Sequence, residues 1–240
     1  MEVQTHTQPS IPKKKGAEYL LLFFIIFAAV FLALLADNWR THLLENNKEM
    51  DYMHALVADL KSDTSTINQT INFNEGIGRA DSSLLFLLRM PEKDIKTLHK
   101  IFILNPIAQN FDYHINDSKT FDRLKYTGDM RLIRNENVLN NITEYYHQID
   151  MINIFKEEIQ NNLVLTYNLS FKVFDQYAYD NYNDPSLALI TQDAAILNEY
   201  TNMIHNLIIT YRMFNRMLRL IKNKAQDLLL LINEEYSLNK

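Results

Sequence analysis

An unbroken apolar run near the N-terminus is the strongest pattern in the chain. From Tyr19 to Leu35 the sequence reads YLLLFFIIFAAVFLALL, with no charged residue. This run makes up most of the stretch 17–36. A helix needs about 17–25 mostly apolar residues to cross the roughly 30 Å of bilayer hydrocarbon. The run therefore predicts a transmembrane helix. Two alternatives stay open: a cleaved signal peptide, although bulky Leu34 stands where a small residue is preferred, and a buried core helix, although every face is apolar.

Aromatic and basic residues flank this run in the way that membrane interfaces favour. Tyr19 lies at its start and Trp39 just after its end, where aromatic side chains anchor spanning helices. Lys13, Lys14 and Lys15 precede the run and are expected at the same interface as Tyr19. Lys and Arg collect on the cytoplasmic side, so the N-terminus is predicted inside and the main domain outside.

A second apolar pattern begins directly after the run. Steps of four and three residues alternate along one helical stripe: Trp39, Leu43, Asn46, Met50, Met53, Val57, Leu60, Thr64, Ile67 and Ile71. This spacing is typical of a coiled coil. Neither Gly nor Pro occurs between Glu18 and Asn72, so one continuous helix from the membrane to about Ile71 is expected. Turn-forming residues in 72–76 predict its end.

The middle of the chain is more broken. Three short helices are predicted there, over 80–89, over 93–103 and up to Tyr126. Pro91 suits the first turn of the second helix, and Asn105-Pro106 is predicted to end it. Asn116 or Asp117 is predicted to cap the third helix, and Gly128 to take the left-handed position after it.

Two long helices are predicted to finish the chain. Asn135 is expected to cap the first, and the second follows a link over 180–186 that contains Asp184-Pro185. The apolar face of the first holds Val138, Ile142, Tyr145, Ile149, Ile152, Phe155, Ile159, Leu163 and Thr166. That of the second holds Ile196, Tyr200, Met203, Leu207, Tyr211, Phe214, Leu218, Ile221, Ala225, Leu228 and Ile232. Both faces have the period of helices packed lengthwise in a bundle.

The predicted fold class is all-α, with one N-terminal transmembrane helix continuing into an elongated antiparallel helical bundle. Residues 1–16 are predicted to be a disordered cytoplasmic tail, 17–36 the transmembrane helix, and 37–240 a helical extracytoplasmic domain. The low number of helix breakers, four Gly and five Pro in 240 residues, agrees with long helices.

Charge and cysteine content narrow the classes of function. The net charge is −5, which argues against nucleic acid as a partner. The chain has no cysteine, which excludes disulfides, thiolate nucleophiles, cysteine-based metal sites and a cysteine-linked lipid anchor.

Two passages resemble a bacterial family of single-pass membrane proteins that is known only as a domain of unknown function. One is Ala33–Arg40, which reads ALLADNWR and carries an Asn-Trp pair at the exit of the span, running into residues 50–63 with their Leu60-Lys61 step. The other is Thr120–Ile133, which reads TFDRLKYTGDMRLI and precedes a helix with Tyr145-Tyr146. The resemblance implies a membrane-anchored helical domain in the bacterial inner membrane, with its main part periplasmic, and it implies no activity.

The sequence contains no recognisable catalytic, cofactor-binding or metal-binding constellation. None of the seven histidines belongs to an HExxH or similar ligand motif. Gly76-Ile77-Gly78 is too short for a phosphate loop and does not follow a strand. The carboxylate pairs Glu157-Glu158 and Glu234-Glu235 are expected on solvated helix faces. We therefore expect no catalytic residue, no cofactor and no metal.

Two groups of residues are candidates for binding a partner. Arg212, Arg216 and Arg219 are spaced to lie on one face of the last helix, which suits an acidic partner or lipid phosphates. Tyr177, Tyr179 and Tyr182 gather near the link before that helix and could form a recognition surface. The alternative for the arginines is a solvated face, and for the tyrosines it is packing at helix ends.

The function predicted from the sequence is that of a non-enzymatic, membrane-anchored structural or interaction protein. Its expected partners are the lipid bilayer and other proteins of the cell envelope, with self-association left open. The alternative is an extracytoplasmic bundle that senses a ligand and passes the signal to a partner protein, since the short N-terminal segment offers no room for a signalling domain.

Overall fold

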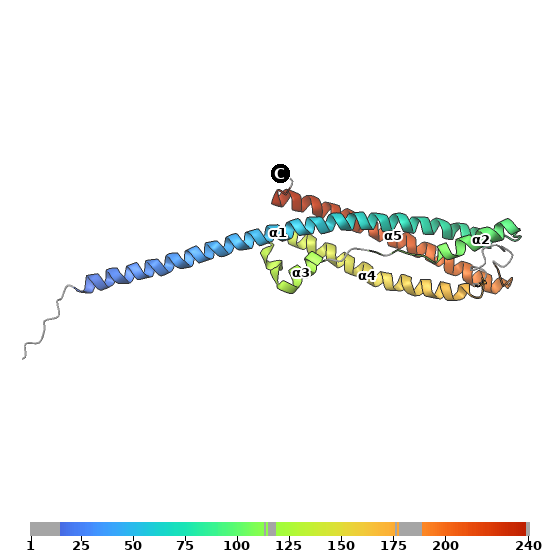
Figure 1. The fold of residues 1–240 in the computed structure, drawn as a ribbon, viewed down its shortest axis with the longest axis horizontal. Coiled ribbons are helices and arrows are strands. Elements are labelled where there is room, and N and C mark those ends of the chain that lie inside the picture. The colour runs from blue at the N-terminus through green and yellow to red at the C-terminus, as the bar shows by residue number, and fades with distance from the viewer. Residues whose placement is uncertain (1–14, 113, 115–118, 176, 178–188, 239–240) are drawn as a thin grey trace, which may run out of the picture. The chain divides into compact units, whose positions relative to one another are not determined.

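The computed structural model describes residues 15–112, 114, 119–175, 177 and 189–238, and none of these is in a strand. The elements, shown in Figure 1, are α1 (Lys15–Leu88), α2 (Ile95–Ala108), α3 (Lys119–Thr127), the short 3-10 helix η1 (Asp129–Leu132), α4 (Glu136–Ser170) and α5 (Ala194–Tyr236). The all-α prediction is confirmed.

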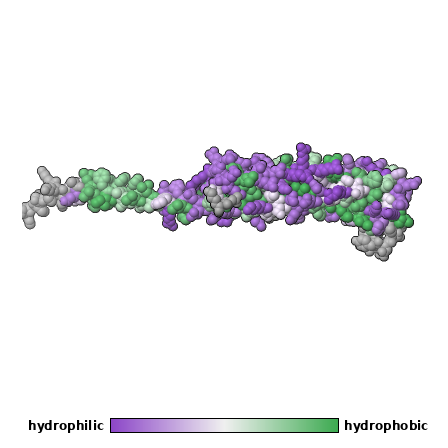
Figure 2. Space-filling model, turned by 90° about the horizontal axis from the view of Figure 1, so that it is seen from above, coloured by the Kyte–Doolittle hydropathy of each residue, from purple (hydrophilic) through white to green (hydrophobic). Residues whose placement is uncertain are grey.

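The chain divides into two compact units, residues 1–50 and residues 51–240. The first holds the N-terminal part of α1, whose apolar side chains from Tyr19 to Leu35 are exposed and form a continuous green band in Figure 2. The second holds every other helix and the hydrophobic core. Residues 1–14 of the predicted tail lie outside the described residues, whereas Lys15 and Gly16 already belong to α1.

Helix α1 is longer than the sequence predicts. The expected end at residues 72–76 is wrong, and the separate helix expected over 80–89 is the last part of α1. Glycine inside a helix costs about 1 kcal/mol relative to alanine, whereas burying one large apolar side chain contributes about 1.5–3 kcal/mol. Ile71, Ile77 and Leu84 are all buried around the two glycines. Tertiary packing therefore outweighs the local preference for a turn.

Helix α2 also differs from its predicted bounds. Pro91 lies in the bend before it, and Asp94 is its N-cap, accepting a hydrogen bond from the backbone N–H of Thr97 at 2.8 Å. Pro106 does not end the helix, which continues to Ala108. Asn105 and Ala108 are both buried in the bundle, and their packing holds this last turn in helical form despite the hydrogen bond that a proline removes.

The predicted end of α3 at Gly128 and the predicted cap of α4 at Asn135 are both found in the structure. Gly128 has φ 71°, in the left-handed region, directly after α3. The side chain of Asn135 caps α4 by accepting from the N–H of Val138 at 3.1 Å. Asn116, Asp117 and the link over 180–186 lie outside the described residues.

The stripe predicted on α1 is buried only from Met53 onward. Trp39, Leu43 and Asn46 are exposed, while Met53 and Leu60 are fully buried. Periodicity identifies a face that is able to pack, but burial needs a neighbour, and Tyr52 has one in η1. Among the described residues, Trp39, Leu43 and Asn46 have the coiled-coil spacing but stay exposed.

Within residues 51–240 the long helices pack lengthwise around one core. Asn68 and Glu75 of α1 contact Lys222 and Arg219 of α5, so these two helices are antiparallel. Asn135, the N-cap of α4, contacts Glu235 of α5, and Asn141 of α4 contacts Lys224, which makes that pair antiparallel as well (Figure 1). At about 1.5 Å per residue, the 43 residues of α5 span roughly 65 Å, so this bundle is elongated.

The predicted core faces of α4 and α5 are confirmed. The positions found buried are Val138, Ile142, Tyr145, Ile149, Ile152, Ile159 and Thr166 on α4, and Tyr200, Leu207, Tyr211, Phe214, Leu218, Ile221, Ala225, Leu228 and Ile232 on α5. Phe155, Leu163, Ile196 and Met203 are partly buried against the same core.

Candidate functional site

The apolar segment of α1 is long enough and apolar enough to cross a membrane, and none of it is buried within the chain. Tyr19 and Trp39, the predicted aromatic anchors, are both exposed on the helix. Lys15 is the first residue of α1, whereas Lys13 and Lys14 lie outside the described residues.

The predicted arginine face of α5 lies partly against α1. Arg219 forms an ion pair with Glu75, and Lys222 donates to the side-chain oxygen of Asn68 at 2.9 Å. Arg212 lines a small pocket between the two helices, and Arg216, one turn further along α5, is exposed outside it. The structure thus gives the three arginines different surroundings, which their spacing alone did not indicate.

Of the three predicted tyrosines, only Tyr177 is among the described residues. Tyr177 is well exposed, and its backbone N–H donates to the carboxylate of Asp175 at 2.9 Å. Tyr179 and Tyr182 lie outside the described residues, so whether these tyrosines form one surface stays a prediction.

A pocket lies beside Arg212, between α1 and α5. It has a volume of about 230 Å³. Its lining residues are Asn74, Glu75, Gly78, Arg79 and Ser82 from α1 with Ile208, Tyr211, Arg212 and Asn215 from α5. Glu75 was expected in a turn, within residues 72–76. Because α1 continues through this stretch, Glu75 and Gly78 lie in one helical wall of the pocket.

Polar atoms without partners are buried in and next to this pocket. The Tyr211 hydroxyl and the Asn215 Oδ1 atom have no hydrogen-bond partner among the described residues, and neither has the carboxyl of Asp81. Burial raises the pKa of Asp81 to about 8, so this side chain is mostly protonated at neutral pH. Burial, with a smaller contribution from Asp81, also raises the pKa of the Tyr211 phenol. Buried groups of this kind cost free energy unless something satisfies them.

None of Asp81, Tyr211 and Asn215 was identified as a site residue from the sequence. Tyr211 was correctly placed on the core face of α5, but nothing in the pattern shows that its hydroxyl lacks a partner. Asp81 does leave a signal: it stands between Ile77 and Leu84 at helical spacing, where an apolar residue is the rule.

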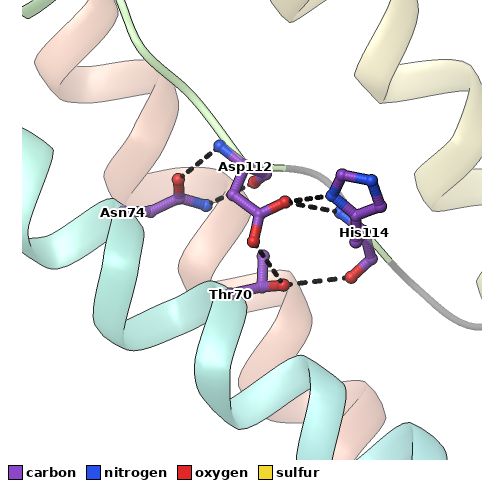
Figure 3. A network of polar contacts seen from close by, with 4 residues as sticks. All are labelled: Thr70, Asn74, Asp112 and His114. Atoms are coloured by element: carbon purple, nitrogen blue, oxygen red, sulfur yellow. Dashed lines mark hydrogen bonds and ion pairs between the residues drawn. The ribbon is translucent and has the colours of Figure 1, made fainter.

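A compact polar network attaches the segment after α2 to α1. The side-chain amide of Asn74 donates to the backbone oxygen of Asp112 at 2.7 Å and accepts from its N–H at 3.0 Å. The Thr70 hydroxyl lies 3.0 Å from the backbone oxygen of His114, and the Asp112 carboxylate accepts from the backbone and ring of His114 (Figure 3). Burial alone would raise the pKa of Asp112, but these hydrogen bonds outweigh it and hold the pKa below its usual value.

This network has a structural role. Asn74 pairs with both backbone groups of Asp112, as a neighbouring strand would do, and so satisfies polar atoms that the loop would otherwise expose to the core. Phe111, the preceding residue, stacks on Tyr211 with ring centroids 4.9 Å apart. The loop thereby closes over one side of the α1–α5 interface.

Two buried tyrosines donate to carboxylates across the bundle. The Tyr145 hydroxyl donates to Asp63 at 2.8 Å, and the Tyr52 hydroxyl donates to Asp129 at 2.6 Å. Burial, and then the charge of Asp63, raises the pKa of the Tyr145 phenol, which therefore stays protonated and keeps donating. Both pairs join α1 to elements distant in the sequence, and both are buried.

An open apolar groove lies between the last turns of α1 and the middle of α2. It has a volume of about 650 Å³. Its lining residues are Ser82, Ser83, Phe86, Leu87, Lys100, Ile103 and Leu104. Phe86 is 67% exposed and Ile103 47% exposed, which is unusual for such large apolar side chains standing together.

Among the described residues, no three His, Asp or Glu side chains come together in a way that could hold a metal ion. The ring of His114 pairs with the carboxylate of Asp112. The acidic pairs Glu157-Glu158 and Glu234-Glu235 lie at exposed positions of α4 and α5.

Comparisons of the chain with protein families, curated proteins and solved structures found no match. The resemblance of residues 33–40 and 120–133 to a bacterial membrane family therefore stays a prediction.

Proposed function

We propose that this chain is a non-enzymatic, membrane-anchored structural or interaction protein of the bacterial cell envelope. The apolar segment of α1 anchors it in the inner membrane, with the N-terminus inside and residues 37–240 in the periplasm. The helical bundle contacts other envelope proteins, and a second copy of the chain is a further option. The groove between α1 and α2 is the observation that carries this proposal.

The groove has the properties of a contact surface for another protein. Phe86 and Ile103 expose apolar area at its rim, while Leu87 and Leu104 line it more deeply. Exposed apolar patches rimmed by polar residues mark sites of protein contact, and aromatic side chains are the usual anchors of such sites. Lys100 and the two serines supply the polar rim.

A charge placed in the groove is expected to abolish partner binding. Phe86→Asp puts a carboxylate on the proposed contact surface, where the partner would have to desolvate it. Full-length protein would be purified from cross-linked envelopes in detergent, and the co-purifying proteins quantified against wild type. Phe73→Asp is the matched control, because Phe73 is also an exposed phenylalanine of α1, at 48%, but does not line the groove.

The proposal predicts that partners seen with wild type are lost in Phe86→Asp and kept in Phe73→Asp. Equal recovery from both variants would show that the groove is not the interface. Because both side chains are exposed, circular dichroism should show the same helix content in all three proteins.

The membrane orientation is tested separately. A reporter active only outside the cytoplasm, fused to the C-terminus, is expected to be active, and one active only inside is expected to be silent. Replacing Lys13, Lys14 and Lys15 with Glu should lower the active fraction, because the positive bias at the inner end is removed. Activity of the cytoplasmic reporter in the unmodified chain would contradict the proposed localisation.

A second candidate function is an extracytoplasmic ligand-sensing bundle that passes its signal to a partner protein. The pocket between α1 and α5, with its unpartnered buried oxygens, favours this candidate. The partner would receive the signal through the bundle surface, which includes the groove.

A further inference from the structure

Two cationic side chains stand at the α1–α5 pocket without partners. Arg79 of α1 and Arg212 of α5 both line it, and the guanidinium group of neither forms a hydrogen bond or ion pair with any described residue. The only carboxylate in the lining, Glu75, is already paired with Arg219. The pocket therefore carries two guanidinium groups available to an anion, and guanidinium groups bind carboxylates through two parallel hydrogen bonds.

The inner side of the pocket requires a hydrogen-bond donor. Asn215 is 4% exposed, and its amide nitrogen donates to the backbone oxygen of Ile71 at 3.4 Å. Because the nitrogen of the Asn215 amide makes that contact, its Oδ1 atom is available as an acceptor. Oδ1 has no hydrogen-bond partner among the described residues. The hydroxyl of Tyr211, 2% exposed and also in the lining, is in the same situation and is able to donate or accept.

Size and walls restrict the ligand further. The volume of about 230 Å³ lies below the roughly 300–1,000 Å³ of pockets for drug-sized ligands, so it suits a small metabolite. Ile208 and the ring of Tyr211 provide an apolar wall, and Phe111 stacks behind that ring.

A neutral hydrogen-bond donor on the ligand suits this pocket better than a cationic one. An ammonium would be held near two arginines, with the one lining carboxylate already engaged, and would lose its hydration against Asn215. A hydroxyl donates its one hydrogen to Asn215 Oδ1 and accepts from the Tyr211 hydroxyl, without these costs.

We propose that the pocket between α1 and α5 binds a small hydroxycarboxylate, with Arg79 and Arg212 on the carboxylate and Asn215 and Tyr211 on the hydroxyl. This inference names the ligand class for the second candidate function and depends on that function for its biological meaning. The binding itself is independent of any partner protein.

Isothermal titration calorimetry on the full chain in detergent tests the proposal with two matched pairs of probes. Malate and succinate differ by one hydroxyl, as do lactate and propionate. We expect malate or lactate to bind and the matched acid without the hydroxyl to bind at least about tenfold more weakly, since Asn215 is then left unpaired. The proposal fails if neither hydroxy acid binds at concentrations up to about 10 mM, or if the members of each pair bind equally.

Variants locate the site. Arg212→Gln and Arg79→Gln should each weaken binding about tenfold or more, because each removes a charged pair with the carboxylate. Arg216→Gln is the matched control: it removes the same charge one turn away on α5, outside the lining, and should leave the affinity unchanged. An equal loss in Arg216→Gln would reduce the interaction to general charge attraction and overturn the assigned site.

Asn215→Leu examines the hydroxyl end and should erase the preference for malate over succinate. This position is buried, so the exposed arginine variants keep the test decisive if Asn215→Leu fails to fold. Malate binding with unchanged partner recovery would uphold the site and refute the sensing function. No binding by any hydroxy acid, with partners still lost in Phe86→Asp, would refute the site and leave the interaction function standing.

Discussion

Leu207→Asp is expected to unfold the helical bundle. Leu207 is 0% exposed and lies on the core face of α5. A carboxylate there loses its hydration and finds no partner, which costs several kcal/mol, whereas a whole domain is stable by only about 5–15 kcal/mol. Thermal unfolding followed by circular dichroism should show a large fall in Tm or no cooperative transition at all.

Leu220→Asp provides the matched control for that variant. Leu220 lies on the same helix but is 61% exposed, so its replacement should change the free energy of unfolding by no more than about 0.5 kcal/mol. A similar loss of stability in both variants would mean that the buried face of α5 has been assigned wrongly.

Asp81→Asn is expected to flatten the dependence of stability on pH. In the folded protein the pKa of Asp81 is about 8, against 3.8 for an unperturbed carboxyl. Between these two values the unfolded chain has released the proton and the folded chain still holds it. The unfolding free energy of wild type therefore falls as pH rises from about 4 to about 8, by up to several kcal/mol. Asparagine does not titrate, so this contribution disappears.

The measurement compares chemical unfolding of wild type and Asp81→Asn from about pH 5 to about pH 8. The difference between the two free energies should change steadily across this range in favour of the variant. Asp112→Asn is an informative control, because the pKa of Asp112 is lowered in the folded protein and its contribution is lost as pH falls. Parallel curves for wild type and Asp81→Asn would contradict the unpartnered burial of Asp81.

The sequence predicts well those parts of the fold that depend on periodicity. Val138 and Leu207, at helical spacing on long amphipathic segments, are both buried where expected. The caps at Asn135 and Gly128 are local in the chain and were also found. The prediction failed at Gly76, where a local turn signal competes with packing against distant residues. The packing contacts that keep this stretch helical come from residues far away in the sequence, so no local window of the sequence contains them.

The candidate pocket illustrates the same limit. Arg212 was selected because it shares a helical face with Arg216 and Arg219. The spacing alone gives no reason to distinguish the three. Only the approach of α1 separates them, because Glu75 pairs with Arg219 and Arg79 joins Arg212 at the pocket. Such differences arise from pairs of residues more than a hundred positions apart, and one sequence does not show which distant positions meet.

Helix α1 is fixed lengthwise in a single register against the rest of the bundle. Its Asp63 accepts from Tyr145 of α4 at 2.8 Å, and its Asn74 is held by both backbone groups of Asp112. A slide of one helical turn would displace each group by about 5.4 Å, beyond hydrogen-bonding range, and leave it unpaired at about 1–3 kcal/mol each. A piston stroke of α1 is therefore a costly motion for this bundle. A ligand between α1 and α5 would act more readily through rotation or bending of these helices than through displacement along their axes.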